Sequence, residues 1–385
     1  MRTAIELVGI LSTLYAAGLN LSYLALWPLA RRGLGREVRR RGWTWYEEAF
    51  ASPLTPAVSI LVAAYNEQET LVDATASLLA QRYPSLELVV VDDGSTDETA
   101  ARLIDAYGLE RVVPAARGEL CYRAVSEVWR TELPHPITLI RKPNGGRADA
   151  LNCALDVAEH EYVCVTDADS ILDPDALSVI LRPVLEDPER VVAVAGTIRI
   201  ANSCRFEAGR MVEARVPRST LAAFQTVEYL RAFLFGRLGW DSLNSLMIVS
   251  GAFGLFRRDV LLAAGGYWAD TVGEDLELTI RLHRHMRDRG GRYRIAYAPD
   301  PICWTEVPED AVTLGRQRRR WHRGLWESLW RHRDMFCRRR YGAPGMVALP
   351  YLLLFEFGGP LIEALAWVMF PIGLAYGMVD PRLVG

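Results

Sequence analysis

Lysine, paired cysteines and glycine-rich nucleotide motifs are scarce or missing in this chain of 385 residues. Among its 44 basic residues Lys142 is the one lysine, and the formal charge of -3 gives no reason to expect nucleic acid as a partner. The six cysteines and six histidines form no Cys-x-x-Cys pair and no cluster, which argues against a disulfide framework and a zinc site. A reducing compartment fits this pattern.

Two nucleotide-binding motifs are also missing, since neither Gly-x-Gly-x-x-Gly nor the P-loop pattern occurs after the first predicted strand. The sequence therefore disfavours a dinucleotide site and a P-loop site. No internal repeat is visible. Half of the residues are apolar, which excludes a disordered chain, and the length fits one large domain or two ordinary ones.

Long apolar runs lie at both ends of the chain. Residues 7–30 carry no charge, and at about 1.5 Å per residue this run exceeds the roughly 30 Å core of a bilayer, which predicts a transmembrane helix within residues 1–30. A basic linker, residues 31–55, follows and contains six arginines: Arg31, Arg32, Arg36, Arg39, Arg40 and Arg41. The positive-inside rule then places the following residues in the cytoplasm.

Residues 346–385 are also mostly apolar, but Glu356, Gly358-Gly359-Pro360 and Pro371 interrupt them. We expect residues 346–355 to form an interfacial or re-entrant helix and residues 361–379 to form one marginal span. The alternative is a helical hairpin buried in a soluble core. The sequence ends at Gly385, six residues after the predicted span, which leaves open that it is a fragment.

Between the ends, short β-branched strands alternate with helical patterns. Strands are predicted at residues 58–63, 86–91, 137–141 and 162–166, with helices at 67–81, 96–107 and 148–158. Near-continuous apolar strands separated by helices predict βαβ units around a buried parallel sheet. Residues 114–136 break the alternation, and we interpret them as an insertion before the third strand.

The residues that follow each predicted strand are polar, and ligands of open α/β sheets bind at that end of the strands. These residues are Tyr65-Asn66-Glu67, Asp92-Asp93-Gly94-Ser95, Lys142 to Gly146, and Asp167-Ala168-Asp169. Carboxylates spaced as Asp-x-Asp can share one Mg²⁺ whose other ligands are water and phosphate oxygens. Asp167 and Asp169 are therefore candidate ligands of a metal and diphosphate site, although such a pair can also cap the next helix.

Two later motifs also carry charge. Glu274 and Asp275 open a predicted helix that continues to residue 289, so they either cap it or supply a general base for a hydroxyl proton. Residues 316–340 hold ten arginines and two acidic residues, which is typical of a helix face near anionic lipid head groups. A catalytic role for the same segment is compatible with that location.

Taken in order, these motifs resemble those of the processive family 2 glycosyltransferases, the group of cellulose, hyaluronan, chitin and poly-N-acetylglucosamine synthases. Five motifs carry the resemblance: Val-Val-Asp-Asp-Gly-Ser-Thr-Asp (90–97), Lys-Pro-Asn-Gly-Gly-Arg-Ala-Asp-Ala-Leu-Asn (142–152), Asp-Ala-Asp (167–169), Gly-Glu-Asp (273–275) and Gln-x-x-Arg-Trp (317–321). The resemblance covers residues 56–335. It implies an α/β fold of the GT-A type, a Rossmann-like mixed sheet that binds nucleotide sugars, over residues 56–310, with transmembrane and interfacial helices on either side. Residues 311–345 would form a basic interfacial helix region.

Residue by residue, the resemblance implies that Tyr65, Glu67 and Asp93, with Asp92 beside them, contact the uracil and ribose of a UDP-sugar. Asp169 would bind Mg²⁺ or Mn²⁺, and Asp167 would lie near the metal or the donor sugar. Lys142 and Asp149 fall in the stretch that lines the donor pocket. Asp275 matches the general base, with Glu274 next to it. Gln317, Arg320 and Trp321 match the motif that closes over the diphosphate and faces the acceptor.

The implied activity is an inverting hexosyl transfer from UDP-N-acetylglucosamine or UDP-glucose to a growing β-linked polysaccharide. The enzyme would lie in the plasma membrane with its catalytic domain in the cytoplasm, and further membrane or export subunits are compatible with it. Three alternatives stay open: a non-processive family 2 transferase acting on a lipid or small acceptor, a non-catalytic membrane subunit with a degenerate transferase domain, and a soluble metal-dependent nucleotidyltransferase.

Two features depart from the family pattern. Gly273 stands where relatives often have threonine, a change outside the carboxylates that bears on the acceptor pocket rather than on the mechanism. Relatives usually carry further membrane helices after the last motif. With one clear span before the domain and at most one after it, we do not expect this chain alone to enclose a polymer channel.

Overall fold

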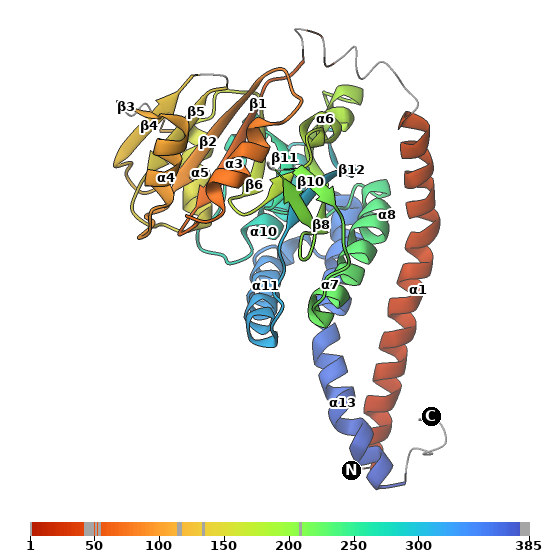
Figure 1. Cartoon of the computed structure of the whole chain (residues 1–385). Helices are drawn as coiled ribbons and strands as arrows, with labels where there is room; N and C mark the ends of the chain where they lie inside the picture. Colours follow the sequence, from red (N-terminus) through yellow and green to blue (C-terminus); the bar gives the residue numbers. More distant parts are fainter. Residues whose placement is uncertain are drawn as a thin grey trace.

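The computed structural model describes residues 2–41, 50, 52, 55–113, 118–132, 135–207 and 210–377. Three predictions fall partly outside these residues: the basic linker beyond residue 41, both ends of the 114–136 insertion, and the end of the second predicted span. The described residues form an α/β body from which two long helices extend in the same direction (Figure 1).

A mixed sheet of ten strands forms the centre of this body, in the order β3-β4-β5-β2-β1-β6-β11-β8-β12-β7. The strands β5 (Ile137–Arg141), β2 (Leu86–Asp92), β1 (Val58–Ala64) and β6 (Tyr162–Asp167) are parallel neighbours. Beyond β6, β11 (Phe253–Arg257) runs antiparallel to β6 and to β8 (Val191–Ile200). Strand β12 (Arg294–Thr305) is parallel to β8 and pairs with the short β7 (Ile171–Leu172) at the sheet edge.

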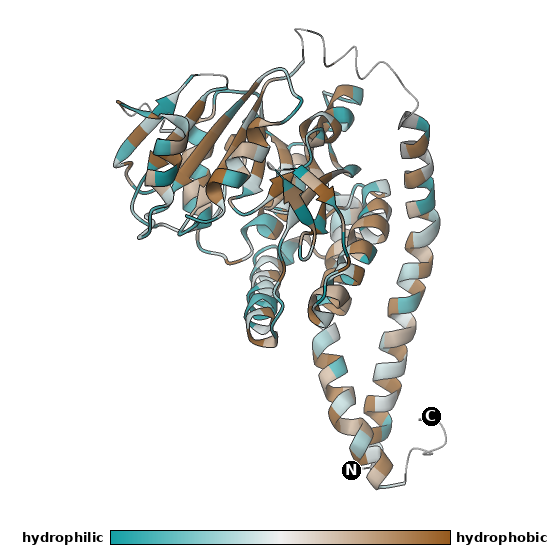
Figure 2. Ribbon diagram, viewed as in Figure 1, coloured by the Kyte–Doolittle hydropathy of each residue, from teal (hydrophilic) through white to brown (hydrophobic). Residues whose placement is uncertain are grey.

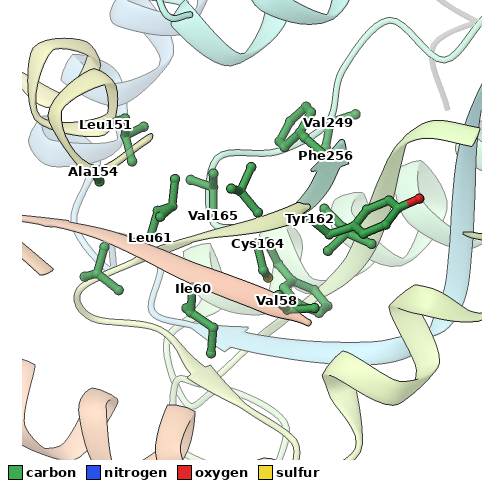
Figure 3. Packing of buried hydrophobic residues seen from close by; sticks show 14 of the residues in the cluster. Val58, Ile60, Leu61, Leu151, Ala154, Tyr162, Cys164, Val165, Val249 and Phe256 are labelled. Carbon is green, nitrogen blue, oxygen red and sulfur yellow. The ribbon is translucent and has the colours of Figure 1, made fainter. Parts of the chain in front are cut away.

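The core lies between the parallel strands and the helices that cover them. Ile60 and Leu61 of β1 and Val165 of β6 are fully buried, and helix α5 (Arg147–Val157) packs its Leu151 and Ala154 against this layer (Figure 3). Burial of each Leu, Ile or Val side chain stabilises the fold by roughly 1.5–3 kcal/mol. The parallel pairing of β5, β2, β1 and β6 confirms the predicted arrangement of these four strands.

Two helices begin later than the sequence pattern predicts. Helix α3 (Leu71–Leu79) starts four residues after 67, and α4 (Thr99–Tyr107) starts three residues after 96. The loops before them bind each other instead: the Thr96 amide donates to Asn66 Oδ1 at 2.8 Å, and the Gln68 amide donates to Asp97 Oδ2 at 3.3 Å. These side-chain bonds satisfy backbone donors outside a helix, which the apolar periodicity does not encode.

The insertion adds a strand to the sheet edge. Strand β4 (Glu127–Thr131) is antiparallel to β5 and to β3 (Glu110–Val112), which no sequence pattern predicted. Ahead of β4, the amides of Gly118 and Glu119 donate to the buried Asp156 carboxylate of α5 at 2.8 and 2.7 Å. The insertion thus lies over the end of α5.

Several helices follow the parallel half of the sheet. They are α6 (Ala176–Glu186), α7 (Thr220–Arg231), the π-helical η1 (Ala232–Arg237), α8 (Leu238–Ser242), α9 (Arg258–Ala263), α10 (Glu274–Asp288) and α11 (Ala311–Arg331). A small hairpin of β9 (Arg205–Glu207) and β10 (Arg210–Glu213) precedes α7. Asp310 caps α11 by accepting hydrogen bonds from the Val312 and Thr313 amides at 3.0 and 2.9 Å.

The two extended helices come from the ends of the chain. Helix α1 (Arg2–Arg41) runs eleven residues past the predicted span and packs on α8 and on α13 (Gly359–Ala375). Along both, apolar side chains are largely exposed, and Figure 2 shows their hydrophobic colouring. Within Ile5–Gly35 and Pro344–Ala375, both are long and apolar enough to cross a bilayer.

The second helical run differs from the prediction of two separate segments. The π-helical η4 (Pro344–Ala348), α12 (Leu349–Tyr351), π-helical η5 (Leu352–Phe357) and α13 follow one another with a bend at Gly358. Pro360 lies in the first turn of α13, where a missing amide donor costs nothing. The Gly-Gly-Pro sequence therefore bends this helical run and does not end it.

Candidate active site

The carboxyl ends of four parallel strands bring the predicted motifs to one edge of the sheet. Register pairs Ala64 with Asp92, Asp92 with Arg141, and Ala63 with Asp167, so the loops after β1, β2, β5 and β6 start side by side. Parallel strands with this register place their following side chains around one crevice. The predicted clustering at the strand ends is therefore observed.

Lys142 lies at the centre of a buried ion cluster. Its side chain is fully buried, and its Nζ contacts Asp93 Oδ1 and lies 2.5 Å from Asp149 Oδ1. Asp93 also accepts hydrogen bonds from the Gly145 amide at 2.9 Å and the Gly146 amide at 2.7 Å. These bonds order the Gly-Gly turn after β5, so Asp93, Lys142 and Asp149 support the crevice from below. Their direct contact with a donor stays a prediction.

The loop after β1 is more exposed than the ion cluster around Lys142. Tyr65 is 49% exposed, and Asn66 beside it has a φ of 58°. The Glu67 amide donates to Thr99 Oγ1 at 2.8 Å, and Thr70 Oγ1 donates to Glu67 Oε2 at 2.7 Å. Asp92, by contrast, is buried and caps its own turn by accepting from the Ser95 amide at 2.9 Å. Tyr65 and Glu67 are therefore accessible beside the strand ends, whereas Asp92 is buried and shapes the loop after β2.

The two aspartates after β6 differ in their surroundings. Asp167 Oδ1 accepts hydrogen bonds from Arg147 Nε at 3.1 Å and Nη2 at 2.6 Å. Asp169 lies at the exposed rim, and among the described residues no guanidinium pairs with it. Partial desolvation, together with the charges of Asp167 and Glu67, raises the pKa of Asp169 to about 6. Clustered carboxylates of this kind favour a cation, and their oxygens suit Mg²⁺ or Mn²⁺.

The base candidate lies on the other side of the crevice, at the first turn of α10. Asp275 Oδ1 accepts from the Leu276 amide at 2.8 Å, and Oδ2 accepts from the Gly251 amide at 3.3 Å. Burial, and then the charge of Glu274, raise the pKa of Asp275 although Arg147 and these amides oppose the shift. A carboxylate whose pKa is raised accepts a proton more readily, as a general base must.

Arg147 connects the two carboxylate motifs, and the sequence reasoning missed it. Besides Asp167, its guanidinium donates to Glu274 Oε1 at 2.9 Å and to the Gly251 carbonyl at 2.8 Å. Burial alone would lower the pKa of Arg147, but Asp167 and Glu274 outweigh it and raise that pKa. The available signal was its place in the 142–152 motif, but no local pattern reveals a partner 127 residues away.

Helix α11 carries the last motif and contacts the base loop directly. Gly324 packs on Gly273 so closely that a Cβ on Gly273 would lie 2.9 Å from Gly324 Cα. The Val272 amide donates to Glu327 Oε2 at 3.1 Å, which joins the same two segments. Trp321 and Arg320 lie one turn before Gly324 on α11; Trp321 is 40% exposed and Arg320 is exposed. Gln317 lies two turns before Gly324, and its Oε1 is a buried atom without a partner among the described residues.

The geometry defines a class of protein. An α/β sheet carries, at one edge, an exposed aromatic and carboxylate loop, an Asp-x-Asp rim and the half-buried base candidate Asp275. Arg147 hydrogen-bonds Asp167 of the rim and Glu274, the neighbour of Asp275. That arrangement is the one expected of an enzyme that binds a nucleotide sugar and activates an acceptor hydroxyl.

Comparisons with known proteins identify the family. Residues 59–263 match Glycosyl transferase family 2, and residues 162–380 match Glycosyl transferase family group 2. The chain therefore belongs to glycosyl transferase family 2, and it is a glycosyltransferase. The predicted family and the predicted α/β fold of GT-A type are confirmed.

Two relatives show how far the similarity reaches. The poly-β-1,6-N-acetyl-D-glucosamine synthase of Staphylococcus aureus strain COL is 30% identical over 81% of this chain and 62% of its own length. The enzyme of that name from Staphylococcus epidermidis is 29% identical over 82% of this chain and 63% of its own. The chain thus spans less than two thirds of the curated relatives that it matches.

A solved structure shares the fold over almost the whole chain. It is a mannosyltransferase from Pyrobaculum calidifontis in complex with GDP-Man and Mn²⁺, with a TM-score of 0.61, 21% identity, and coverage of 99% of this chain and 94% of that one. At that identity the likeness concerns the fold, including the two terminal helices.

Proposed function

We propose that this chain is a membrane-bound inverting glycosyltransferase that moves a sugar from UDP-N-acetylglucosamine or UDP-glucose to a growing β-linked polysaccharide. The observation that carries the proposal is the Arg147 bridge, which holds the Asp-x-Asp rim and the Gly-Glu-Asp base motif in one hydrogen-bonded unit. The staphylococcal relatives are poly-β-1,6-N-acetyl-D-glucosamine synthases, which supports the polysaccharide product and favours UDP-N-acetylglucosamine as the first donor to test.

The donor would occupy the crevice above β1, β2 and β6. The exposed ring of Tyr65 offers a stacking surface for uracil, and Glu67 offers acceptors for ribose hydroxyls. The buried cluster of Asp93, Lys142 and Asp149 would hold the crevice rigid while the nucleotide exchanges.

Among the described residues no three His, Cys, Asp or Glu side chains converge on one point. Asp169 still fits a divalent cation, because its carboxylate has a raised pKa and pairs with no guanidinium in the described part of the chain. A diphosphate would supply further oxygen ligands. Mg²⁺ or Mn²⁺ held there with Asp167 would offset the charge of the departing UDP. The exposed guanidinium of Arg320 would add a second cation to that end.

The acceptor hydroxyl would lose its proton to Asp275. Its two oxygens are oriented by the Leu276 and Gly251 amides, and Arg147 donates to Oε1 of the neighbouring Glu274 at 2.9 Å. Attack on the face of the sugar opposite UDP inverts the anomeric carbon and gives a β-linkage from an α-linked donor. Trp321 would support the apolar face of the acceptor sugar.

The membrane location rests on the two terminal helices. Their exposed apolar length fits spans, and the arginines that follow the first span favour a cytoplasmic catalytic domain. A further membrane or export subunit is compatible with this proposal.

Detergent-purified protein assayed for UDP release over a panel of nucleotide sugars tests the proposal. Turnover of a UDP-hexose with an oligosaccharide acceptor supports it. Turnover with a lipid acceptor and singly extended products would favour the non-processive alternative, and nucleotidyl transfer without UDP release would replace the proposal.

A further inference from the structure

An ion pair between Arg318 of α11 and Glu228 of α7 lies beside Trp321. We call these two residues the frame. Arg318, one turn before it on α11, places its guanidinium over the Trp321 ring at 4.7 Å from the ring centroid. The same guanidinium forms a bidentate pair with Glu228 of α7, with Nη1 to Oε1 at 2.8 Å and Nη2 to Oε2 at 2.6 Å. A two-bond fork fixes the plane of a guanidinium as well as its position.

The frame is supported where α7 meets the start of α11. The Gln225 side chain, one turn before Glu228, donates to the Pro308 carbonyl at 2.8 Å, and Ser219 Oγ donates to the Glu309 carbonyl at 3.4 Å. Gln225 is also buried. These contacts join α7 to the segment that leads into α11, so the two helices that carry Glu228 and Arg318 are also connected outside the ion pair.

One face of the indole is therefore taken by Arg318, while Trp321 remains 40% exposed. A cation held on one face polarises the ring and prevents it from turning, which leaves the opposite face for another group. We propose that Glu228 and Arg318 are positioning residues that hold Trp321 as a fixed platform for the acceptor sugar. This inference rests on the proposed function only for the identity of the acceptor.

An exchange of the two charges can distinguish the positioning of Trp321 from a simple connection between α7 and α11. Exchange of the two side chains, Glu228→Arg with Arg318→Glu, can restore a salt bridge between α7 and α11 but puts a carboxylate near the ring. If only the connection of the helices mattered, the exchange would restore function. If the cation over Trp321 matters, the exchange restores stability alone.

A matched pair elsewhere provides the control. Arg284 of α10 and Asp334 also form a bidentate pair, at 3.1 and 2.6 Å, and their side chains are 33% and 38% exposed, against 35% and 41% for Arg318 and Glu228. Arg284→Gln therefore removes a bidentate ion pair of similar exposure, together with a longer pair from Arg284 Nε to Asp288 Oδ2 at 3.8 Å. Among the described residues, the partners of this guanidinium are Asp334 and Asp288, not Trp321.

The first experiment needs no sugar. The full-length protein labelled with 5-fluorotryptophan gives a ¹⁹F signal for Trp321, assigned by its loss in Trp321→Phe. Glu228→Gln and Arg318→Gln should shift or broaden that signal, and Arg284→Gln should leave it unchanged. An unchanged Trp321 signal in both frame variants would overturn the proposal.

The second experiment measures transfer with UDP-N-acetylglucosamine and a short β-linked N-acetylglucosamine oligosaccharide. Glu228→Gln should raise the acceptor KM by roughly two- to fivefold, the range that a cation over an aromatic face implies, with the donor KM unchanged. The exchanged pair should recover thermal stability and keep the raised acceptor KM. An exchanged pair with a wild-type acceptor KM would show that only helix connection matters and would overturn the role of the cation. Absence of transfer in the wild type together with a responsive ¹⁹F signal would refute the proposed function and leave the frame intact.

Discussion

Gly273→Thr restores the residue that family relatives often carry, and the structure predicts that it damages this enzyme. A Cβ at position 273 would lie 2.9 Å from Gly324 Cα and 3.1 Å from its carbonyl carbon. Because carbon atoms prefer separations of about 3.5–4.0 Å, α10 and α11 would have to part by about 0.6–1.1 Å. The obstacle is backbone, which cannot rotate away as a flexible side chain can.

Two quantities follow from that displacement. Overpacking of this size costs about 1–3 kcal/mol of unfolding free energy, which thermal or denaturant unfolding in detergent can measure. Asp275 follows Gly273 by two residues, and Trp321 lies on the displaced helix, so their relative position changes as well. A misplacement of about 1 Å can lower the transfer rate by up to about 10²-fold.

Gly315→Ala is the matched control for this substitution. Gly315 lies on the same helix, but a Cβ there meets nothing within 4 Å. Alanine should therefore keep activity and stabilise α11 by up to about 1 kcal/mol. If Gly273→Thr keeps both the wild-type melting temperature and the wild-type rate, the close contact of α10 with α11 is not what positions the site.

Four further predictions follow from the site. Asp275→Asn should lower transfer by about 10² to 10⁴ while UDP binding, measured by calorimetry, stays near wild type; a collapse of UDP affinity would make the residue structural. EDTA should abolish turnover and Mn²⁺ or Mg²⁺ restore it, and undiminished turnover of metal-stripped Asp169→Asn would contradict the cation assignment. The pKa of Asp169 is raised from 3.8 to about 6, so its protonated form adds stability to the fold that is full below pH 3.8 and is lost as the pH rises through 6. Metal-free Asp169→Asn should therefore have a higher melting temperature than the wild type at pH 7.5. This difference should disappear as the pH falls. Impermeant maleimide on intact cells should leave Cys121 and Cys204 unlabelled until lysis, and labelling from outside would reverse the proposed topology.

Much of the fold follows from local pattern. Near-continuous apolar runs predicted β1, β2, β5 and β6 within one residue at each end, because a strand buried on both faces leaves little room for polar side chains. Motif positions at the strand ends then predicted which residues would share the crevice.

The contacts that orient the site residues could not be predicted from the sequence. The sequence showed that Asp167 and Glu274 are acidic, but not that Arg147 binds both of them. It showed Gly273 as a departure, but its reason is Gly324, which comes from another helix. Such contacts depend on how elements far apart in the sequence pack together, and no periodicity within one helix or strand encodes that packing.

The product of the purified enzyme tests the central claim most directly. With UDP-N-acetylglucosamine, a divalent cation and a short β-linked acceptor, size-resolved products should form a series that grows well beyond one added sugar. Trp321→Ala should still bind UDP but make little polymer. Trp326, whose ring stacks on Trp330 and on Phe357 of η5, is the comparison, and Trp326→Ala should mainly change stability or membrane association. Products extended by a single sugar with every UDP-hexose would contradict the account and identify a non-processive transferase.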